Sequence, residues 1–202
     1  MTKKIINKVD QYYSEKISEF GTTSKGVDWN GEESHYLRFE QLTKILTKNK
    51  DFTLLDFGCG YGSLIQFLNE KKFDYNYTGY DISSAMLNEG RKKFQGYNFT
   101  NEISNDLFDF TIANGIFNVK LSTPKKEWEK YMFKTLNQIN NLSAEGFSFN
   151  ILTSYSDKKY MKDYLYYANP LEIFDYCKRI FSRNVALLHD YELYEFTVLV
   201  RK

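Results

Sequence analysis

The chain has 202 residues, of which 42% are hydrophobic and 26% are charged, a composition typical of a folded globular protein and not of a disordered one. Its 27 Lys and Arg residues nearly balance its 26 Asp and Glu residues, and the basic residues are scattered, which does not favour a nucleic-acid-binding protein. No apolar run approaches the roughly 20 residues of a membrane helix, and the N-terminus lacks the apolar region of a signal peptide. Two isolated cysteines, Cys59 and Cys177, exclude a disulfide scaffold or a structural zinc site. We expect a cytoplasmic protein with no metal, membrane or nucleic-acid partner.

Residues 1–50 predict two helices ahead of any strand. Apolar residues recur at helical spacing over residues 5–20, and Gly21 ends this helix. A polar loop follows, and a second amphipathic helix is expected over residues 32–48. We expect residues 1–50 to form a helical lid over one edge of a sheet.

From residue 52 onward, short apolar runs alternate with amphipathic segments. Strands are expected at Phe52–Phe57, Asn76–Tyr80, Tyr97–Thr100, Phe108–Asn114, Phe147–Thr153, Asn184–Leu188 and Glu195–Arg201. Helices are expected at Ser63–Lys71, Ser84–Phe94, Pro124–Asn141 and Pro170–Phe181. This alternation predicts one α/β domain with a seven-stranded, mostly parallel sheet, helices on both faces and an antiparallel last strand. Residues 51–202 would form its ligand-binding core.

The most informative stretch is residues 54–63, where a buried strand ends in Gly58-Cys59-Gly60-Tyr61-Gly62 and passes into a helix. Glycines here allow a tight turn with positive φ and let a ligand approach the backbone closely. The first N–H groups of the helix can face an anionic group. An ordinary tight strand–helix turn is the alternative.

Asp81 ends the second predicted strand, 23 positions (81 − 58) after the first glycine. An acid at this place can accept both hydroxyls of an adenosine ribose. The alternative is an N-cap for the next helix, and the two roles are compatible.

These residues resemble the class I S-adenosylmethionine-dependent methyltransferases. Residues 54–62 match the family's first motif, two hydrophobic residues followed by Asp-x-Gly-x-Gly-x-Gly, and residues 80–87 match its second. The resemblance covers residues 52–117 in its motifs and fits the order of elements to the end of the chain. It implies a Rossmann-like fold, S-adenosylmethionine as the cofactor and methyl transfer as the reaction.

The resemblance also implies roles for single residues in the first half of the site. Asp56 would orient the loop and lie close to the amino group of the cofactor's methionine moiety. Gly58 and Gly60, with Cys59 between them, would let the cofactor pass close to the backbone. Asp81 would bind the ribose.

The remaining matches would surround the adenine and the methyl group. Ile82 and Met86 would line the adenine, and Glu102-Ile103 occupy the place of a loose third motif that meets adenine N6, although Glu102 could equally be a surface acid. Asn114 begins Asn-Gly-Ile-Phe, where the methionine end is flanked. Methyltransferases that act on exocyclic or amide nitrogens commonly have two prolines within this tetrapeptide, so methylation of adenine N6 or of a glutamine amide is not expected. The sequence has no basic stripe and no added recognition domain, which favours a small acceptor such as a sugar, a surface-polysaccharide or a natural-product intermediate, with O-methylation favoured over N-methylation.

Residues for the methyl acceptor are less sharply marked. His189, predicted at the carboxyl end of a strand, is the better candidate for a general base, and His35 the weaker one. Arg38, beyond the loop that contains Trp29, could pair with the methionine carboxylate or with a surface acid such as Glu40.

Two further features bear on the function. Three tyrosines after the fifth predicted strand would form substrate walls or pack as core: Tyr155, Tyr166 and Tyr167.

A nicotinamide-dependent oxidoreductase is a weaker alternative, because its Gly-x-Gly-x-x-Gly motif needs glycine where this chain has Ser63. A non-enzymatic cofactor-binding module is the other alternative.

Overall fold

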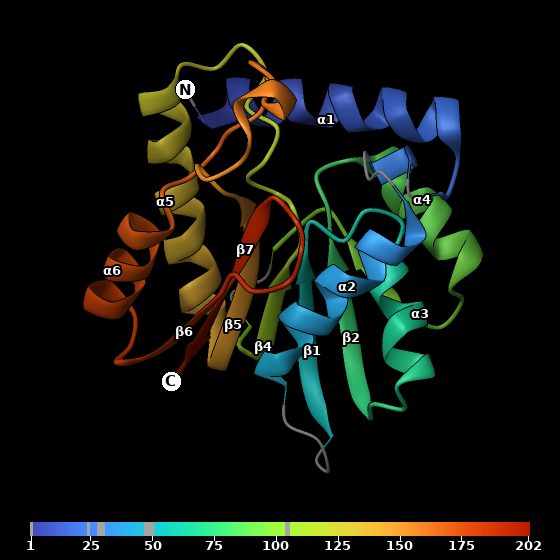
Figure 1. Cartoon of the computed structure of the whole chain (residues 1–202). Helices are drawn as coiled ribbons and strands as arrows, with labels where there is room; N and C mark the ends of the chain where they lie inside the picture. The colour runs from blue at the N-terminus through green and yellow to red at the C-terminus, as the bar shows by residue number, and fades with distance from the viewer. Residues whose placement is uncertain (1, 24, 28–30, 47–50, 104–105) are drawn as a thin grey trace.

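The computed structural model describes residues 2–23, 25–27, 31–46, 51–103 and 106–202. Its centre is a seven-stranded sheet in the order β3-β2-β1-β4-β5-β7-β6 (Figure 1). Strand β7 pairs antiparallel with β5 and β6, whereas the other pairs are parallel, which confirms the predicted fold class. The strands are β1 (Phe52–Phe57), β2 (Tyr75–Tyr80), β3 (Asn98–Thr100), β4 (Phe108–Ala113), β5 (Ser143–Leu152), β6 (Asn184–Leu188) and β7 (Glu195–Arg201).

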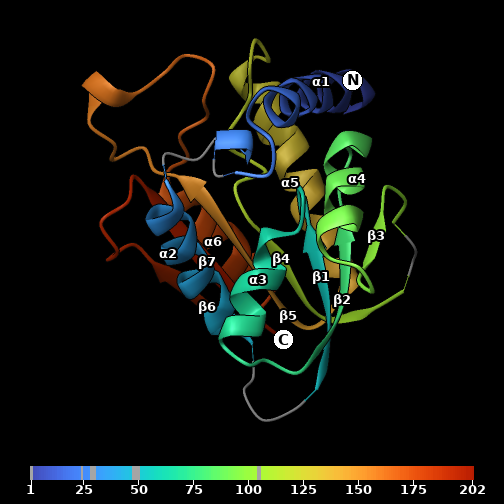
Figure 2. The ribbon, with the colours of Figure 1, turned by 90° about the vertical axis from the view of Figure 1, so that its right-hand side faces the viewer.

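Helices cover both faces of the sheet (Figures 1 and 2). Helices α2, α3 and α4 bury residues in one core cluster, and α5 and α6 bury theirs in another. None of the helices within the described ranges is long and apolar enough to cross a membrane. The helices are α1 (Thr2–Phe20), α2 (Glu32–Leu42), α3 (Ser63–Glu70), α4 (Ser84–Lys93), α5 (Lys125–Leu142) and α6 (Pro170–Ile180), with 3-10 turns η1 (Lys25–Val27), η2 (Thr43–Ile45) and η3 (Lys158–Tyr160).

Alternate residues of the central strands supply the two clusters. In β1, Leu54 packs with α2 and α3, whereas Leu55 packs with α5 and α6. Because successive side chains of a strand point to opposite faces, a strand buried on both sides reads as a continuous apolar run. This is the pattern from which the parallel sheet was predicted.

Two predicted boundaries differ from the structure by more than one residue. Strand β5 begins at Ser143, directly after α5, and not at Phe147. The Ser143 hydroxyl oxygen lies 2.7 Å from Ile139 O and 2.8 Å from Thr111 Oγ1, so one side chain serves the end of α5 and the neighbouring strand. Helix α2 ends at Leu42 and continues as η2, earlier than predicted.

The two N-terminal helices occupy different places. Helix α1 lies across the carboxyl ends of the strands (Figure 1) and buries Ile5 and Val9 in the α5–α6 cluster. Helix α2 instead packs on the sheet, where Phe39 and Leu42 are buried and Ser148 Oγ donates to Leu42 O at 2.9 Å. Of the two helices expected over the sheet edge, only α1 lies there.

Candidate functional site

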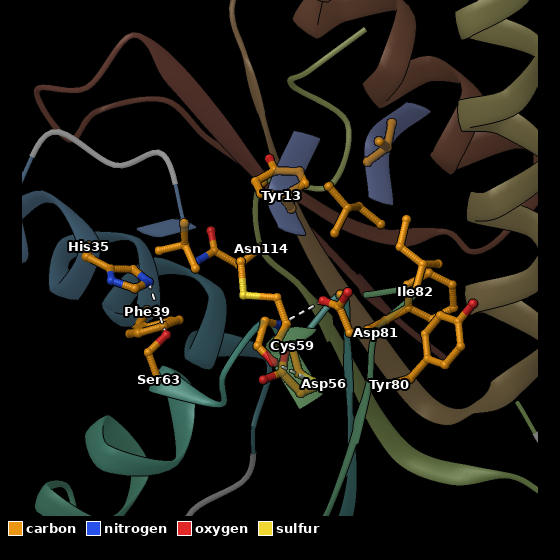
Figure 3. Close-up of a pocket in the computed structure, with 18 of the residues that line it drawn as sticks. Tyr13, His35, Phe39, Asp56, Cys59, Ser63, Tyr80, Asp81, Ile82 and Asn114 are labelled. Atoms are coloured by element: carbon orange, nitrogen blue, oxygen red, sulfur yellow. Dashed lines mark hydrogen bonds between the residues drawn. The ribbon is translucent and has the colours of Figure 1, made fainter. Parts of the chain in front are cut away.

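A cavity opens at the carboxyl ends of β1, β2 and β4, beneath α1 (Figure 3). We refer to it as the first cavity. Its walls come from eight elements and from the loops after three strands, so it exists only in the folded chain. The lining residues are Val9, Tyr13, Val27, His35, Phe39, Asp56, Phe57, Gly58, Cys59, Gly60, Ser63, Tyr80, Asp81, Ile82, Met86, Asn114, Gly115, Ile116 and Tyr131.

The glycine loop after β1 forms the floor of the first cavity. Gly58 has φ +82°, and a Cβ atom there would lie 2.3 Å from Cγ2 of Ile116. The N–H groups of Gly58 and Cys59 donate to Tyr80 O at 2.7 and 3.0 Å, which fastens the loop to the end of β2. The loop therefore has the conformation and the space that only glycine tolerates, as expected where a ligand passes close to the backbone.

Asp81 joins this loop to the turn between β2 and α4. Its Oδ2 accepts from Gly60 N at 2.8 Å, and its Oδ1 accepts from Ser83 N at 2.8 Å. The N-cap of α4 is Ser83, whose Oγ accepts from Met86 N, so Asp81 does not have that capping role. Burial raises the pKa of Asp81 to about 6, although its backbone donors act in the opposite direction.

Asp56, at the end of β1, is buried and accepts from Tyr77 OH at 2.8 Å. Burial raises the pKa of this carboxyl to about 7, and nearby Asp81 adds to the effect. A cationic ligand group beside Asp56 would favour its charged form.

Side chains near Asp81 give the first cavity an apolar end. Ile82 and Met86, the residues predicted to line adenine, line this end of the cavity together with Tyr80 and Tyr131. The sequence analysis missed Tyr131, because α5 follows the motifs by a long interval and its aromatic residues read as core.

The third-motif residues are not brought to the first cavity. Glu102 is exposed after β3, and Thr100 Oγ1 accepts from its backbone N–H. Ile103 packs against the core, and neither residue is among those that line the cavity.

His35 is a cavity residue that the sequence analysis rated as the weaker histidine. Its ring lies against Phe39, with centroids 4.6 Å apart, and its Nε2 lies 3.3 Å from Ser63 Oγ. Burial, and then the neighbouring Arg38, lower the pKa of His35 to about 3, so the imidazole is neutral at physiological pH. His35 lies one helical turn before Phe39, on the buried face of α2, and this spacing was the sequence signal that it would be buried.

Arg38 forms a buried ion pair with Glu195. Its Nε donates to Glu195 Oε2 at 2.8 Å, whereas Glu40 pairs with Lys71. Arg38 lines a second cavity and not the first. Trp29, expected in the same region, lies outside the described residues.

The second cavity, of about 470 Å³, adjoins the first and shares Tyr13, Val27 and Gly115 with it. Its volume is in the range of small-molecule sites. Its other lining residues are Arg38, Asn118, Val119, Leu152, Ser156, Tyr160, Lys162, Tyr164, Leu165, Tyr167, Glu192, Leu193 and Tyr194.

Two chain segments are tied together to form its wall. The N–H groups of Lys120 and Leu121 donate to Tyr164 O, and Tyr166 N donates to Asn118 O at 2.8 Å. Of the three tyrosines expected as substrate walls, Tyr167 lines the cavity. Tyr166 is buried and donates to Glu129, and Tyr155 is 66% exposed.

His189 lines neither cavity. It is exposed just beyond β6, the outermost strand, with ring centroids 6.0 Å from Tyr155 and 5.9 Å from Phe196. The loop between β6 and β7 does emerge at the carboxyl edge, as the topology predicted. It reaches the second cavity through Glu192, Leu193 and Tyr194, and the structure does not bring His189 to the acceptor region beside Asn114.

The two cavities account for most of the predicted site. Lining the first are eight residues from the sequence analysis, namely Asp56, Gly58, Cys59, Gly60, Asp81, Ile82, Met86 and Asn114. Within the described ranges, no group of three or more His, Cys, Asp and Glu side chains is arranged to hold a metal ion.

Comparisons with known proteins identify a family and a fold. A family model described as a methyltransferase domain matches residues 55–146. Rv1506c of Mycobacterium tuberculosis (strain ATCC 25618 / H37Rv), which is provisionally named a methyltransferase, is 45% identical over 163 residues, covering 79% of this chain and 98% of that protein.

Solved structures share the fold at low sequence identity. The plantazolicin methyltransferase BpumL, in a complex with a desmethylPZN analog and SAH, has a TM-score of 0.61 at 14% identity, with 100% of each chain covered. An S-adenosylmethionine-dependent methyltransferase from Clostridium acetobutylicum ATCC 824 has a TM-score of 0.55 at 17% identity, covering 96% of this chain and 98% of that one. The sheet order, the glycine loop and the relative at 45% identity agree, and the chain belongs to the class I S-adenosylmethionine-dependent methyltransferases.

Proposed function

We propose that this chain binds S-adenosylmethionine in the first cavity and transfers its methyl group to a hydroxyl group of a small molecule in the second. The observation that carries the proposal is that the two cavities meet at Tyr13, Val27 and Gly115. A methyl group held at this junction would be exposed to both.

The donor set of the first cavity fits S-adenosylmethionine. Asp81 supplies carboxylate oxygens for ribose hydroxyls, and the apolar side chains around Ile82 and Met86 suit adenine. Gly58 and Gly60 line the first cavity with backbone atoms alone, which leaves room for close passage of the cofactor. The bound cofactor supplies an activated methyl group, and the chain's own residues bind it, orient it and exclude water.

The second cavity fits a polar acceptor with a ring or a hydroxylated surface. Tyrosine rings from η3, from the segment after it and from the β6–β7 loop form much of its wall. Lys162 adds a positive charge and Glu192 a negative one, whereas the charge of Arg38 is paired with Glu195. Positive charge stabilises an oxygen that becomes anionic as it loses its proton. Gly115 and Ile116 stand where enzymes that methylate planar NH2 groups commonly have prolines, which also favours oxygen.

Positioning of the acceptor would supply much of the rate, because the sulfonium already activates the transferred carbon. We assign no general base within the cavities. His189 would act as the general base only for an acceptor that extends to the outer edge of the sheet.

The test is to incubate the protein with methyl-labelled S-adenosylmethionine and a small-molecule extract, and to identify labelled products by mass spectrometry and NMR. We expect label in a methyl ether or ester. Label on nitrogen would contradict the acceptor assignment. Tight binding of the cofactor with no labelled product would favour the non-enzymatic module instead, and binding of NAD in place of S-adenosylmethionine would contradict the proposal.

A further inference from the structure

A chain of buried polar side chains connects α2 to the first cavity through the middle of the sheet. Arg38 Nε donates to Glu195 Oε2 at 2.8 Å. Asn150 Nδ2 donates to Glu195 Oε1 and to Asn114 Oδ1, both at 2.9 Å. Glu195 and Asn150 are 1% and 0% exposed. Polar groups this deeply buried are costly unless every member is paired, and this chain ends at a residue of the cavity wall.

One backbone group fixes the direction of all these hydrogen bonds. The Gly115 N–H group can only donate, and it donates to Asn150 Oδ1. The amide nitrogen of Asn150 therefore donates its two hydrogens, one to the Glu195 carboxylate and one to Asn114. Asn114 must then accept through its oxygen, which leaves its NH2 group as the donor.

The Asn114 NH2 group is available to a ligand. Asn114 is only partly buried, and it lies in the wall of the first cavity (Figure 3). Within the part of the chain that the structure describes, no hydrogen-bond partner is recorded for its Nδ2 atom. An amide donor of fixed orientation suits an anionic group such as a carboxylate.

The order of the strands indicates which ligand group comes near Asn114. Asp81 follows β2, Asp56 ends β1 and Asn114 follows β4, and these strands are neighbours in the order β2-β1-β4. A cofactor with its ribose at Asp81 would carry its amino-acid end across β1 toward β4. Asp56 suits the ammonium group of that end, which leaves the carboxylate for a donor.

We propose that Asn150, held by Glu195 and Arg38, is a positioning residue that presents the Asn114 NH2 group to the carboxylate of S-adenosylmethionine. The inference rests on the proposed function, since it requires that cofactor in the first cavity. Asn114 is then the residue that contacts the cofactor, and Asn150 sets which of its two amide atoms faces the cavity.

Calorimetry with two ligands tests this inference without any knowledge of the acceptor. S-adenosylhomocysteine carries the amino-acid group, whereas 5′-methylthioadenosine lacks it. Asn114→Asp keeps the bond accepted from Asn150 but replaces the donor by an acceptor. Because a hydrogen bond to a charged group is lost, we expect S-adenosylhomocysteine to bind about 10- to 100-fold more weakly and 5′-methylthioadenosine to bind within about twofold of wild type. Asn184→Asp, at the exposed start of β6, controls for the added charge and should change neither affinity.

Asn150→Asp tests the positioning step. The new carboxylate can accept from Gly115 N–H but cannot donate, so Asn114 would turn its NH2 group away from the cavity. The ratio of the two affinities should shift by about tenfold in the same direction as for Asn114→Asp. An effect on fold stability alone would weaken both ligands together and leave the ratio unchanged. If the Asn150→Asp variant does not fold, Asn150→Ala takes its place; it removes the side chain that binds both Gly115 N–H and Asn114 Oδ1, and the ratio should shift in the same direction.

The results distinguish a failure of this inference from a failure of the proposed function. Equal weakening of both ligands by Asn114→Asp, or no weakening of either, overturns the assignment of the Asn114 donor to the carboxylate. If the wild-type protein binds neither nucleoside, the proposed cofactor is wrong, and this inference falls with it.

Discussion

His35 Nε2 lies 3.3 Å from Ser63 Oγ, and this contact joins the buried face of α2 to the first turn of α3 at the wall of the first cavity. The imidazole is neutral because burial and Arg38 lower its pKa to about 3. A helix that packs on the sheet thus contributes directly to the wall of the first cavity.

His35 should make the fold sensitive to acid. A histidine whose folded-state pKa is about 3, against 6.5 for its model value, makes the folded state less stable as the pH falls through that window. At pH 5 this loss is about 2 kcal/mol relative to neutral pH. His35→Gln should therefore destabilise the protein more at pH 7.5 than at pH 5, as measured by urea unfolding. The exposed His189→Gln variant is the control, and an equal effect of His35→Gln at both pH values would contradict the prediction.

Asp81→Ala should weaken cofactor binding. The change removes the acceptor of Gly60 N–H and, if the proposed function holds, two hydrogen bonds to the ribose, so we expect a loss of about 2 kcal/mol or more in the binding of S-adenosylhomocysteine. Titration calorimetry measures it, with Asp74→Ala, on the exposed turn before β2, as the matched control. An unchanged affinity would limit Asp81 to holding the loop.

Gly58→Ala should abolish cofactor binding. Its Cβ would lie 2.3 Å from Ile116 Cγ2, and φ +82° is strained for alanine. Gly96→Ala is a matched control, because Gly96 has φ +90° with no atom within 4 Å of its Cβ position, so strain acts there without a clash. Ile116→Ala in the Gly58→Ala background should restore part of the fold stability. If Gly58→Ala and Gly96→Ala bind S-adenosylhomocysteine equally well, close approach at Gly58 is not required.

Helix α1 should become more protected when ligands bind. Tyr13 lines both cavities, and Val9 lines the first, so an occupied site would give this helix more contacts than an empty one. Hydrogen exchange in residues 9–20, and in the Gly21–Gly31 segment, should slow on addition of S-adenosylhomocysteine and slow further with the acceptor. Equal exchange with and without ligands would make α1 a fixed cover and not a lid.

His189→Ala should leave kcat within about threefold of wild type for the acceptor found by labelling. The reason is its position beyond the outermost strand, outside both cavities. A positioned general base contributes roughly 10²- to 10⁴-fold, so a loss of that size with unchanged cofactor affinity would establish His189 as the base.

The sequence by itself determined the parts of the protein that depend on local chain geometry. The bounds of β1, β6 and β7 agree with prediction to the residue, because alternation and apolar runs reflect the period of a strand. The glycine loop and Asp81 were also predictable, since a tight turn and an acid at the next strand end are features of a short stretch of chain.

Only the tertiary structure decided which distant side chains meet. Arg38 and Glu195 are 157 residues apart in the chain, and nothing in either segment indicates that they form a buried ion pair. The same is true of Asn150 beside Asn114, of the wall of the second cavity and of the packing of α2 on the sheet. The position of His189 outside both cavities could not be predicted, for the converse reason. The end of a parallel strand lies at the carboxyl edge of the sheet, but its distance from the glycine loop along that edge depends on the order of the strands. Because β7 lies between β5 and β6, the end of β6 is far from the loops after β1 and β4. Side chains that meet through tertiary packing leave no periodic pattern in the sequence. The free energy gained by burying them depends on the apolar area removed from water and not on their separation along the chain.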